Sequence, residues 1–139
     1  MSGHSILYLG SGDFAAEYLS ELETLPLCTY LTRSSTHELP EDASYIVDLI
    51  LLEVGPVIAQ SGRALTDLIN ELAPYPVIAL TSKDREHRGI AAVRAGAQAY
   101  ICIDDITVDA QEIAFDHAVK RGRMQSRLSS TDVTVLSIL

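Results

Sequence analysis

The sequence predicts an α/β protein built on a doubly wound, five-stranded parallel sheet. Five short apolar runs alternate along the chain with segments of helical spacing, and these runs lie at 5–9, 27–32, 48–54, 75–81 and 99–103. Most positions in these runs are apolar, as expected of strands that are buried on both faces. Strands that alternate with helices join through right-handed crossovers, which place helices on both faces of a parallel sheet.

The segment after the first strand predicts an amphipathic helix over 13–24. Its apolar residues recur at helical spacing, namely Phe14, Tyr18, Leu19 and Leu22. Asp13 is favourable at the positive N-terminal end of such a helix, and Pro26 ends it. The second strand follows at 27–32, and the polar residues 33–46 then predict a loop with at most a short helix.

The second half of the chain continues the alternation. After the strand at 48–54, a core-facing helix is predicted from Leu65, Leu68, Ile69 and Leu72. Ser82 and Asp84 predict the start of a helix over 83–95, and Gly96 is placed to close it. After the last strand, a long helix is predicted from about Thr107 to about Leu128, which Gly122 weakens.

Length, composition and charge indicate one domain and exclude several classes of protein. The chain has 139 residues, 47% of them hydrophobic, which is enough to bury a core. Its formal net charge of −9 argues against binding to nucleic acids or to anionic membranes, although 120–127 (KRGRMQSR) is locally basic. No apolar run reaches the length of a membrane span, and the N-terminus lacks the features of a signal peptide, so we expect a cytoplasmic protein.

The residues that most often carry catalysis form no recognisable constellation. Cys28 and Cys102 lie far apart in apolar runs, so we expect buried, free thiols rather than a disulfide. The four histidines lack metal-ligand spacing and are expected to be polar surface residues, namely His4, His37, His87 and His117. Without a nucleophile elbow or a Cys/His signature, we expect no enzyme activity, no metal site and no cofactor.

Three segments resemble a response-regulator receiver domain. They are VDLILLEVGP (47–56), YPVIALTS (75–82) and AAVRAGAQAYICID (91–104). The resemblance extends from about Ile6 to about Arg123 and preserves the order and spacing of the segments. It implies a flavodoxin-like receiver topology for residues 1–126, followed by a helical exit or linker at 127–139.

The end of the chain suggests a larger protein. It runs into an apolar terminus that looks like the beginning of another element. Receivers with a similar exit are often joined to histidine kinase, diguanylate cyclase or phosphodiesterase modules. We therefore expect the N-terminal regulatory domain of a larger signalling protein.

In a doubly wound fold, chemistry takes place beyond the carboxyl ends of the strands. The resemblance places the receiver's phosphoacceptor aspartate at Glu53, and its switch positions, a hydroxyl and an aromatic residue, at Thr81 and Tyr100. The other functional positions are lost. The magnesium-binding acids are replaced at Gly10, Ser11 and Gly12, and the lysine and the proline after it are replaced by Ile103 and Asp104.

These replacements predict a degenerate, or pseudo-receiver, domain. Mg²⁺ lacks its oxygen ligands, and no lysine neutralises a developing phosphoryl charge. Glu53 is one methylene longer than aspartate, so its carboxylate would project into the space of a phosphoryl group. Two interpretations remain open: Glu53 imitates a phosphorylated state by hydrogen bonding to Thr81, or it is a solvated carboxylate at a strand end.

Such a domain must act through its surface, as a protein-interaction or dimerisation module. We expect the face formed by the fourth helix, the fifth strand and the fifth helix, at about 83–125, to bind a protein partner or a second copy. Its candidate residues are Arg85, Arg88, Ile90, Arg94, Asp104 and Asp105, with Val93, Tyr100, Ile101 and Asp116 as further contributors. Ile113 on the last helix is a further candidate contact.

An alternative is a small-ligand or nucleotide sensor at the turn from Gly10 to Asp13. Gly10-x-Gly12-x-x-Ala15 follows a strand and opens a helix, as in a dinucleotide-binding turn. No acidic residue ends the second strand to hold a ribose, but Arg33 would suit a 2′-phosphate. The chain has no room for a substrate domain, and its later segments favour a receiver.

Overall fold

The computed structural model describes residues 3–10, 15–34, 47–54, 65–72 and 75–122. Its strands form one parallel sheet in the order β2-β1-β3-β4-β5. They are β1 (His4–Leu9), β2 (Cys28–Ser34), β3 (Leu49–Glu53), β4 (Val77–Thr81) and β5 (Ala99–Cys102). The predicted five-stranded parallel sheet with receiver-like topology is confirmed.

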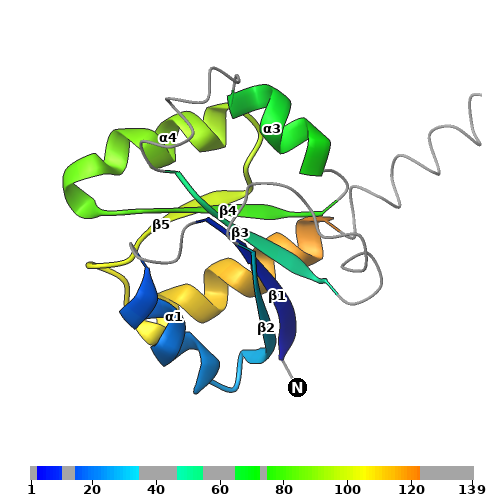
Figure 1. The fold of residues 1–139 in the computed structure, drawn as a ribbon, viewed down its shortest axis with the longest axis vertical. Helices are drawn as coiled ribbons and strands as arrows, with labels where there is room; N and C mark the ends of the chain where they lie inside the picture. The colour runs from blue at the N-terminus through cyan, green and yellow to red at the C-terminus, as the bar shows by residue number, and fades with distance from the viewer. Residues whose placement is uncertain (1–2, 11–14, 35–46, 55–64, 73–74, 123–139) are drawn as a thin grey trace, which may run out of the picture.

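Helices cover both faces of this sheet (Figure 1). One face packs against α1 (Ala16–Glu23) and the C-terminal helix, residues 108–122. The opposite face packs against α3 (Leu65–Leu72) and α4 (Glu86–Arg94). None of the described helices has the length and apolarity needed to cross a membrane.

Two cores follow from the alternation of side chains along each strand. The core on the α1 face contains Tyr8, Leu51 and Leu80 together with Phe115 of the C-terminal helix. The core on the α3 and α4 face contains the alternate strand positions, including Leu7, Leu52 and Ala79, together with Leu68 of α3. Because successive side chains point to opposite faces, this alternation also decides which side chains at the strand ends can contact one another.

The strand boundaries lie within two residues of the predictions, and two differences affect neighbouring segments. The helix predicted over 83–95 divides into a 3₁₀ turn, η2 (Lys83–Arg85), and α4. Ser82 does not cap it, because the Ser82 hydroxyl hydrogen bonds to Asp84 Oδ1 at 2.6 Å instead of to the backbone. Gly96 follows α4 with a φ of 124°, as expected of a closing glycine. In the other case, β2 continues to Ser34 into the predicted loop.

The C-terminal helix begins as predicted, with Thr107 as its N-cap. The Thr107 hydroxyl accepts a hydrogen bond from the Ala110 N–H at 3.1 Å. At the other end, a Cβ on Gly122 would lie 3.0 Å from Cγ of Pro76. Gly122 is therefore explained by the close approach of the helix to the residue before β4. The predicted continuation to Leu128, the loop at 35–46 and the helix start at 13 lie outside the described residues.

Gly89 in the middle of α4 makes room for the ring of Tyr100. A Cβ at this position would lie 2.6 Å from Cγ and 2.8 Å from Cβ of Tyr100. These atoms belong to the base of the side chain and cannot rotate away freely. Glycine costs helical stability of about 1 kcal/mol relative to alanine, so its presence here reflects packing.

We predict that Gly89→Ala destabilises the protein, although alanine is the better helix former. Overpacking costs about 1–3 kcal/mol, which exceeds the gain of about 1 kcal/mol in helix propensity. Urea unfolding monitored by circular dichroism measures the net change. In a Tyr100→Ala background the same substitution should cost less, or stabilise the protein. Stabilisation by Gly89→Ala in the presence of Tyr100 would contradict this packing.

Candidate functional site

The carboxyl ends of β3, β4 and β5 bring the sequence-predicted site residues to one edge of the sheet. Glu53 is the register partner of Leu80, and Thr81 is the partner of Cys102. Ile103 follows directly after β5. Glu53, Thr81 and Ile103 therefore lie at the same edge, where receivers carry their phosphorylation site.

Glu53 is buried at this edge and binds a tyrosine from the neighbouring strand. Its residue is 8% exposed, and its Oε2 accepts a hydrogen bond from the Tyr8 hydroxyl at 3.2 Å. Burial of a carboxylate is costly unless hydrogen bonds replace its water. The interpretation of Glu53 as a solvated carboxylate is therefore wrong.

Tyr8 is the residue of this site that sequence reasoning missed. It is fully buried, in a strand that otherwise contributes aliphatic side chains to the core. A phenol in such a strand carries a hydroxyl that needs a partner, and this is the signal that was available in the sequence. Only the pairing of β1 with β3 identifies Glu53 as that partner.

Gly10 lies directly against the Glu53 side chain. A Cβ at position 10 would lie 2.6 Å from Cβ of Glu53 and 2.9 Å from the Tyr8 hydroxyl oxygen. No side chain fits there without moving both residues, so an acidic residue at this position is sterically excluded. The residues present do not fit a receiver's magnesium ion, because position 10 cannot supply a ligand and positions 11 and 12 carry no carboxylate.

The other interpretation of Glu53 depends on a hydrogen bond to Thr81, and none joins these two residues in the described part of the chain. The Thr81 hydroxyl instead donates to the carbonyl oxygen of Arg85 at 3.0 Å. The reason is the alternation of side chains: Thr81 follows Ala79 on the α3 and α4 face, whereas Glu53 follows Leu51 on the α1 face. The sheet therefore separates the two side chains that the prediction joined.

Tyr100 hydrogen bonds to Glu86, which directly follows Arg85, the partner of Thr81. Its hydroxyl donates to Glu86 Oε2 at 2.8 Å, while its ring packs against Gly89. This hydrogen bond is the main cause that raises the pKa of the Tyr100 phenol and lowers the pKa of the Glu86 carboxyl. Thr81 and Tyr100 thus fix the first turn of α4 through consecutive residues, Arg85 and Glu86.

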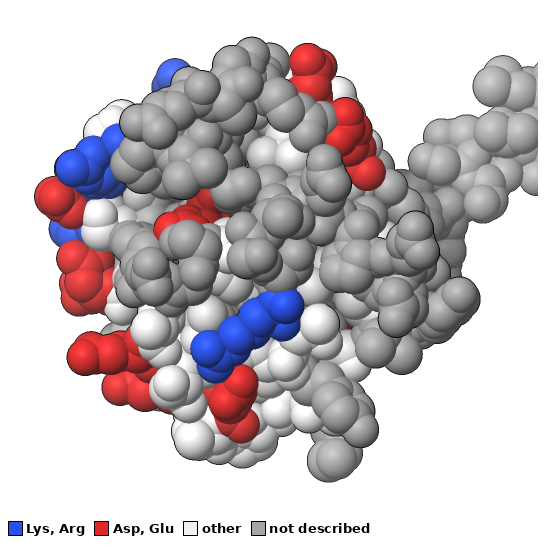
Figure 2. Space-filling model, viewed as in Figure 1, with Lys and Arg blue, Asp and Glu red and all other residues white. Residues whose placement is uncertain are grey.

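Charged side chains surround this first turn. The backbone N–H of Lys83 donates a hydrogen bond to Asp104 Oδ1 at 2.9 Å. The side-chain Nζ of Lys83 lies 3.5 Å from Glu86 Oε1 and 3.6 Å from Asp105 Oδ2. Glu86 and Asp105 raise the pKa of the Lys83 ammonium, Glu86 more strongly. Figure 2 shows acidic and basic groups side by side on the left of the molecule, where Figure 1 places this end of α4.

The lysine position of receivers is apolar in this chain. Ile103 is partly buried and packs against the core on the α1 face. Lys83 approaches the same edge, but its ammonium group is engaged with Glu86 and Asp105. Ile103 has no charge, and the charge of Lys83 is paired with Glu86 and Asp105, so neither residue is suited to neutralise a phosphoryl group at Glu53.

The predicted interaction face is exposed at most of its positions. Ile90 and Val93 of α4 are each 39% exposed, and Arg85, Arg94, Asp104 and Asp105 are also exposed, whereas Arg88 is partly buried. Ile101 is 2% exposed, so its expected contact with a partner is wrong, because it faces the core. Ile113 is 57% exposed on the C-terminal helix.

Asp116 was assigned to this face, and that assignment is wrong. Its Oδ1 lies 2.8 Å from Nε2 of His4 at the opposite edge of the sheet, where β1 begins. His4 is buried, so its expected position on the surface is also wrong. The two residues are 112 positions apart, and no local pattern in the sequence links them.

Cys28 and Cys102 are free thiols, as expected. Cys102 is buried and Cys28 is partly buried. Burial is the main cause that raises the pKa of both thiols. Neither thiol therefore has the lowered pKa of a reactive cysteine.

The described part of the alternative nucleotide site is anionic. Gly10 lies against the Glu53 carboxylate, and Arg33 is paired with Glu23 through a 2.9 Å contact between Nη2 and Oε1. Ser11, Gly12 and Asp13 lie outside the described residues. Within the described ranges, no group of three or more His, Cys, Asp or Glu side chains is placed to hold a metal ion.

Comparisons with known proteins give matches only among solved structures. No protein-family model matches the sequence, and no curated protein is significantly similar to it. A solved fusion with the yeast Spc42 trimeric coiled coil aligns with a TM-score of 0.66 and 16% identity, over 99% of this chain and 97% of that chain.

Response regulators are among the similar structures. A receiver domain protein from Clostridium thermocellum aligns with a TM-score of 0.60 and 16% identity, over 88% of this chain and 98% of that chain. The response regulator ChrA of a heme-sensing two-component system aligns with a TM-score of 0.60 and 21% identity, over 91% of this chain and 66% of that chain. At these identities the similarity shows the fold: this chain has the fold of response regulator receiver domains.

Proposed function

We propose that this protein is a receiver-like signalling module that acts by protein association and does not use phosphorylation. The observation that carries the proposal is the environment of Glu53. Its carboxylate is buried against Gly10 and hydrogen bonded to Tyr8, at the strand end where receivers accept a phosphoryl group. A side chain held in this way leaves no space at position 10 for an acidic residue.

The chemistry of phosphoryl transfer supports the same conclusion. Transfer requires a metal ion and a cation that stabilise the charge spread over the phosphoryl oxygens. This chain has Gly10, Ser11 and Gly12 in place of the acids and Ile103 in place of the lysine. The chain therefore lacks the groups that catalyse phosphoryl transfer in receivers, and its function would depend on its surfaces.

The proposed surface combines apolar and charged side chains around α4 and β5. Ile90 and Val93 expose apolar area on α4, and Arg94 lies next to Val93 in the sequence, while Asp104 and Asp105 follow β5. Exposed ion pairs contribute about 0–1 kcal/mol each, so the charges would set register and the apolar contacts would supply most of the affinity. A second copy of the chain is the partner that we propose.

Two hydrogen bonds hold this surface in one conformation. Thr81 binds Arg85, and Tyr100 binds Glu86, so the start of α4 is fixed from two strands. In a receiver that responds to phosphorylation, the switch residues report on the phosphoryl group. Here neither of these hydrogen bonds involves Glu53, which supports a constitutive rather than a phosphorylation-dependent surface.

The alternative function is a nucleotide or small-ligand sensor at the Gly10–Asp13 turn. The glycine spacing after a strand favours it, whereas the Glu53 carboxylate behind Gly10 would repel a phosphate. Titration with nucleotides distinguishes the two functions. Saturable binding that Gly12→Asp abolishes would favour the sensor.

We predict that the protein takes up no phosphate from acetyl phosphate and binds no beryllofluoride in the presence of Mg²⁺. The reason is that Glu53 is engaged and the metal ligands and the lysine are absent. Intact-mass spectrometry measures the first outcome, and fluorine NMR measures the second. A phosphate found on Glu53 would contradict the proposed function.

We further predict that Glu53→Asp alone does not restore phosphorylation. The shorter side chain vacates space, but it adds neither a metal ligand nor a cation. Restoration should also need acids at Ser11 and Gly12 and a lysine at Ile103, because Gly10 has no room for a side chain. Phosphorylation of the single variant at a receiver-like rate, measured with acetyl phosphate, would show that this account of the pocket is wrong.

We predict a concentration-dependent dimer that charge reversal weakens. In a symmetric dimer, each contact between Arg94 and Asp105 occurs twice, so reversing one residue should cost up to about 2 kcal/mol, or roughly 30-fold in Kd. Arg94→Glu and Asp105→Arg should each weaken the dimer, and the double variant should recover part of the loss. Analytical ultracentrifugation measures Kd.

Glu17→Arg provides the control for this experiment, because Glu17 is an exposed residue of α1 on the opposite face of the sheet. It changes the net charge by the same amount as Asp105→Arg and should leave Kd unchanged. A strict monomer at high concentration would eliminate the homodimer and leave a heterologous protein partner for this surface.

A further inference from the structure

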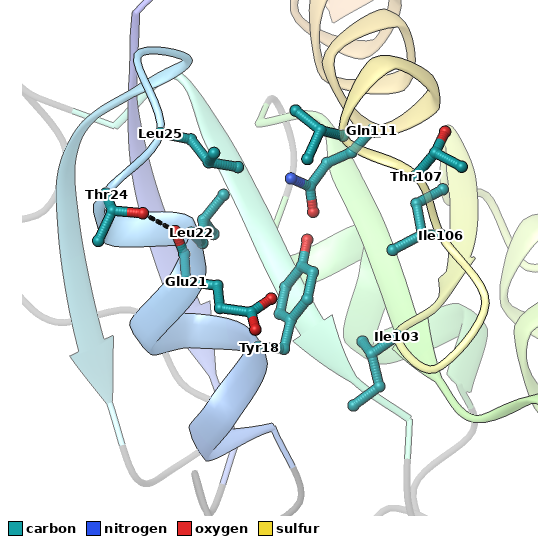
Figure 3. A pocket seen from close by; sticks show the side chains of 10 residues that line it. Tyr18, Glu21, Leu22, Thr24, Leu25, Ile103, Ile106, Thr107 and Gln111 are labelled. Carbon is teal, nitrogen blue, oxygen red and sulfur yellow. Dashed lines mark hydrogen bonds between the residues drawn. The ribbon is translucent and has the colours of Figure 1, made fainter.

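A small pocket lies between α1 and the beginning of the C-terminal helix. It has a volume of about 270 Å³ and opens on the face of the sheet opposite to α4 (Figure 3). Its apolar walls are formed by Leu22 and Leu25 on one side and by Ile103 and Ile106 on the other. The pocket shares Ile103 with the carboxyl edge of the sheet, but neither Glu53 nor Gly10 is among the described residues that line it.

Two buried polar atoms in this pocket have no hydrogen-bond partner among the described residues. They are the Tyr18 hydroxyl and Oε1 of Gln111, whose residues are 9% and 4% exposed. Figure 3 shows them pointing toward one another, Tyr18 from α1 and Gln111 from the C-terminal helix. Buried polar groups are hydrogen bonded in the great majority of native structures, so an unpartnered pair that lines a pocket indicates a missing partner.

We propose that this pocket binds a small, uncharged or cationic molecule that has an apolar body and one hydroxyl or amino group. The polar group of such a ligand satisfies both protein atoms at once. A ligand hydroxyl donates a hydrogen bond to Oε1 of Gln111, which can only accept, and accepts one from the Tyr18 hydroxyl, whereas a ligand ammonium group donates to both oxygen atoms. The apolar body then lies against the leucine and isoleucine walls.

The electrostatic surroundings select against an anionic ligand. The Glu21 carboxylate lies at the rim of the pocket, and the chain has a formal net charge of −9. Burial raises the pKa of Tyr18, with a smaller contribution from Cys28, so the phenol remains protonated and able to donate at neutral pH. An anion would face Glu21, and none of the described residues that line the pocket carries a cationic side chain.

The volume sets the size of the ligand. Pockets for drug-sized molecules span about 300–1,000 Å³, so a pocket of about 270 Å³ suits a compact ring or a short aliphatic chain. Because the ligand would contact α1 and the C-terminal helix together, binding would join the two helices that cover this face. This inference does not depend on the proposed association through α4.

Amide NMR titration of the protein with four one-ring probes tests the proposal. Phenol and benzylamine carry the required hydroxyl and amino groups, whereas toluene lacks a polar group and benzoate is anionic. We expect phenol and benzylamine to shift the amides of Leu22, Ile106 and Gln111 saturably, and to bind at least about tenfold tighter than toluene, as one additional buried hydrogen bond allows. Benzoate should bind more weakly than both.

Tyr18→Phe separates a ligand site from a purely structural tyrosine. It should weaken phenol binding by about tenfold, and it should leave the melting temperature of the unliganded protein unchanged or raise it, because the lost hydroxyl has no partner. Tyr75→Phe is the matched control, since Tyr75 packs on the α3 and α4 face, and it should leave phenol binding unchanged.

Three results would overturn the proposal. They are phenol and toluene binding with equal affinity, an unchanged phenol Kd in Tyr18→Phe, and no saturable shift by any probe at its solubility limit. The last result would mean that ordered water alone satisfies Tyr18 and Gln111. None of these results bears on phosphorylation or on the α4 surface, so the two proposals fail independently.

Discussion

One buried carboxylate constrains the whole carboxyl edge of the sheet. Glu53 ends the central strand β3, where it is buried, and it is stabilised by the Tyr8 hydroxyl from β1. Gly10 must then remain without a side chain, because Glu53 and Tyr8 occupy the space that a Cβ would need. The glutamate on β3 therefore explains why position 10 carries no acidic side chain: the Glu53 side chain fills the space that one would need.

The sheet itself divides the remaining site residues into two groups. Tyr8 and Glu53 face α1 and the C-terminal helix, whereas Thr81 and Tyr100 face α3 and α4. Thr81 and Tyr100 hold the start of α4 through Arg85 and Glu86. A fixed α4 presents its exposed apolar and charged side chains in one arrangement, which is the physical basis of the association that we propose.

The two helical layers differ in what they offer to other molecules. The α4 layer exposes Ile90 and Val93 among charged groups, a combination suited to a protein surface. The α1 layer instead contains a small pocket with two unpartnered polar atoms, Tyr18 Oη and Gln111 Oε1, which suits a small molecule. One fold can thus carry a protein contact and a ligand contact on opposite faces, because function depends on sites rather than on architecture.

The sequence by itself determined the order of strands and helices along the chain and the parallel sheet, because apolar runs that alternate with segments of helical spacing are local signals. The resemblance to receivers added the receiver-like topology. It also placed Glu53, Thr81 and Ile103 at one edge. Only the tertiary structure decided which side chains meet: Tyr8 with Glu53, Thr81 with Arg85, and His4 with Asp116 across 112 positions. These partners depend on the register of neighbouring strands and on the face toward which each side chain points, and neither is written in a local pattern of residues.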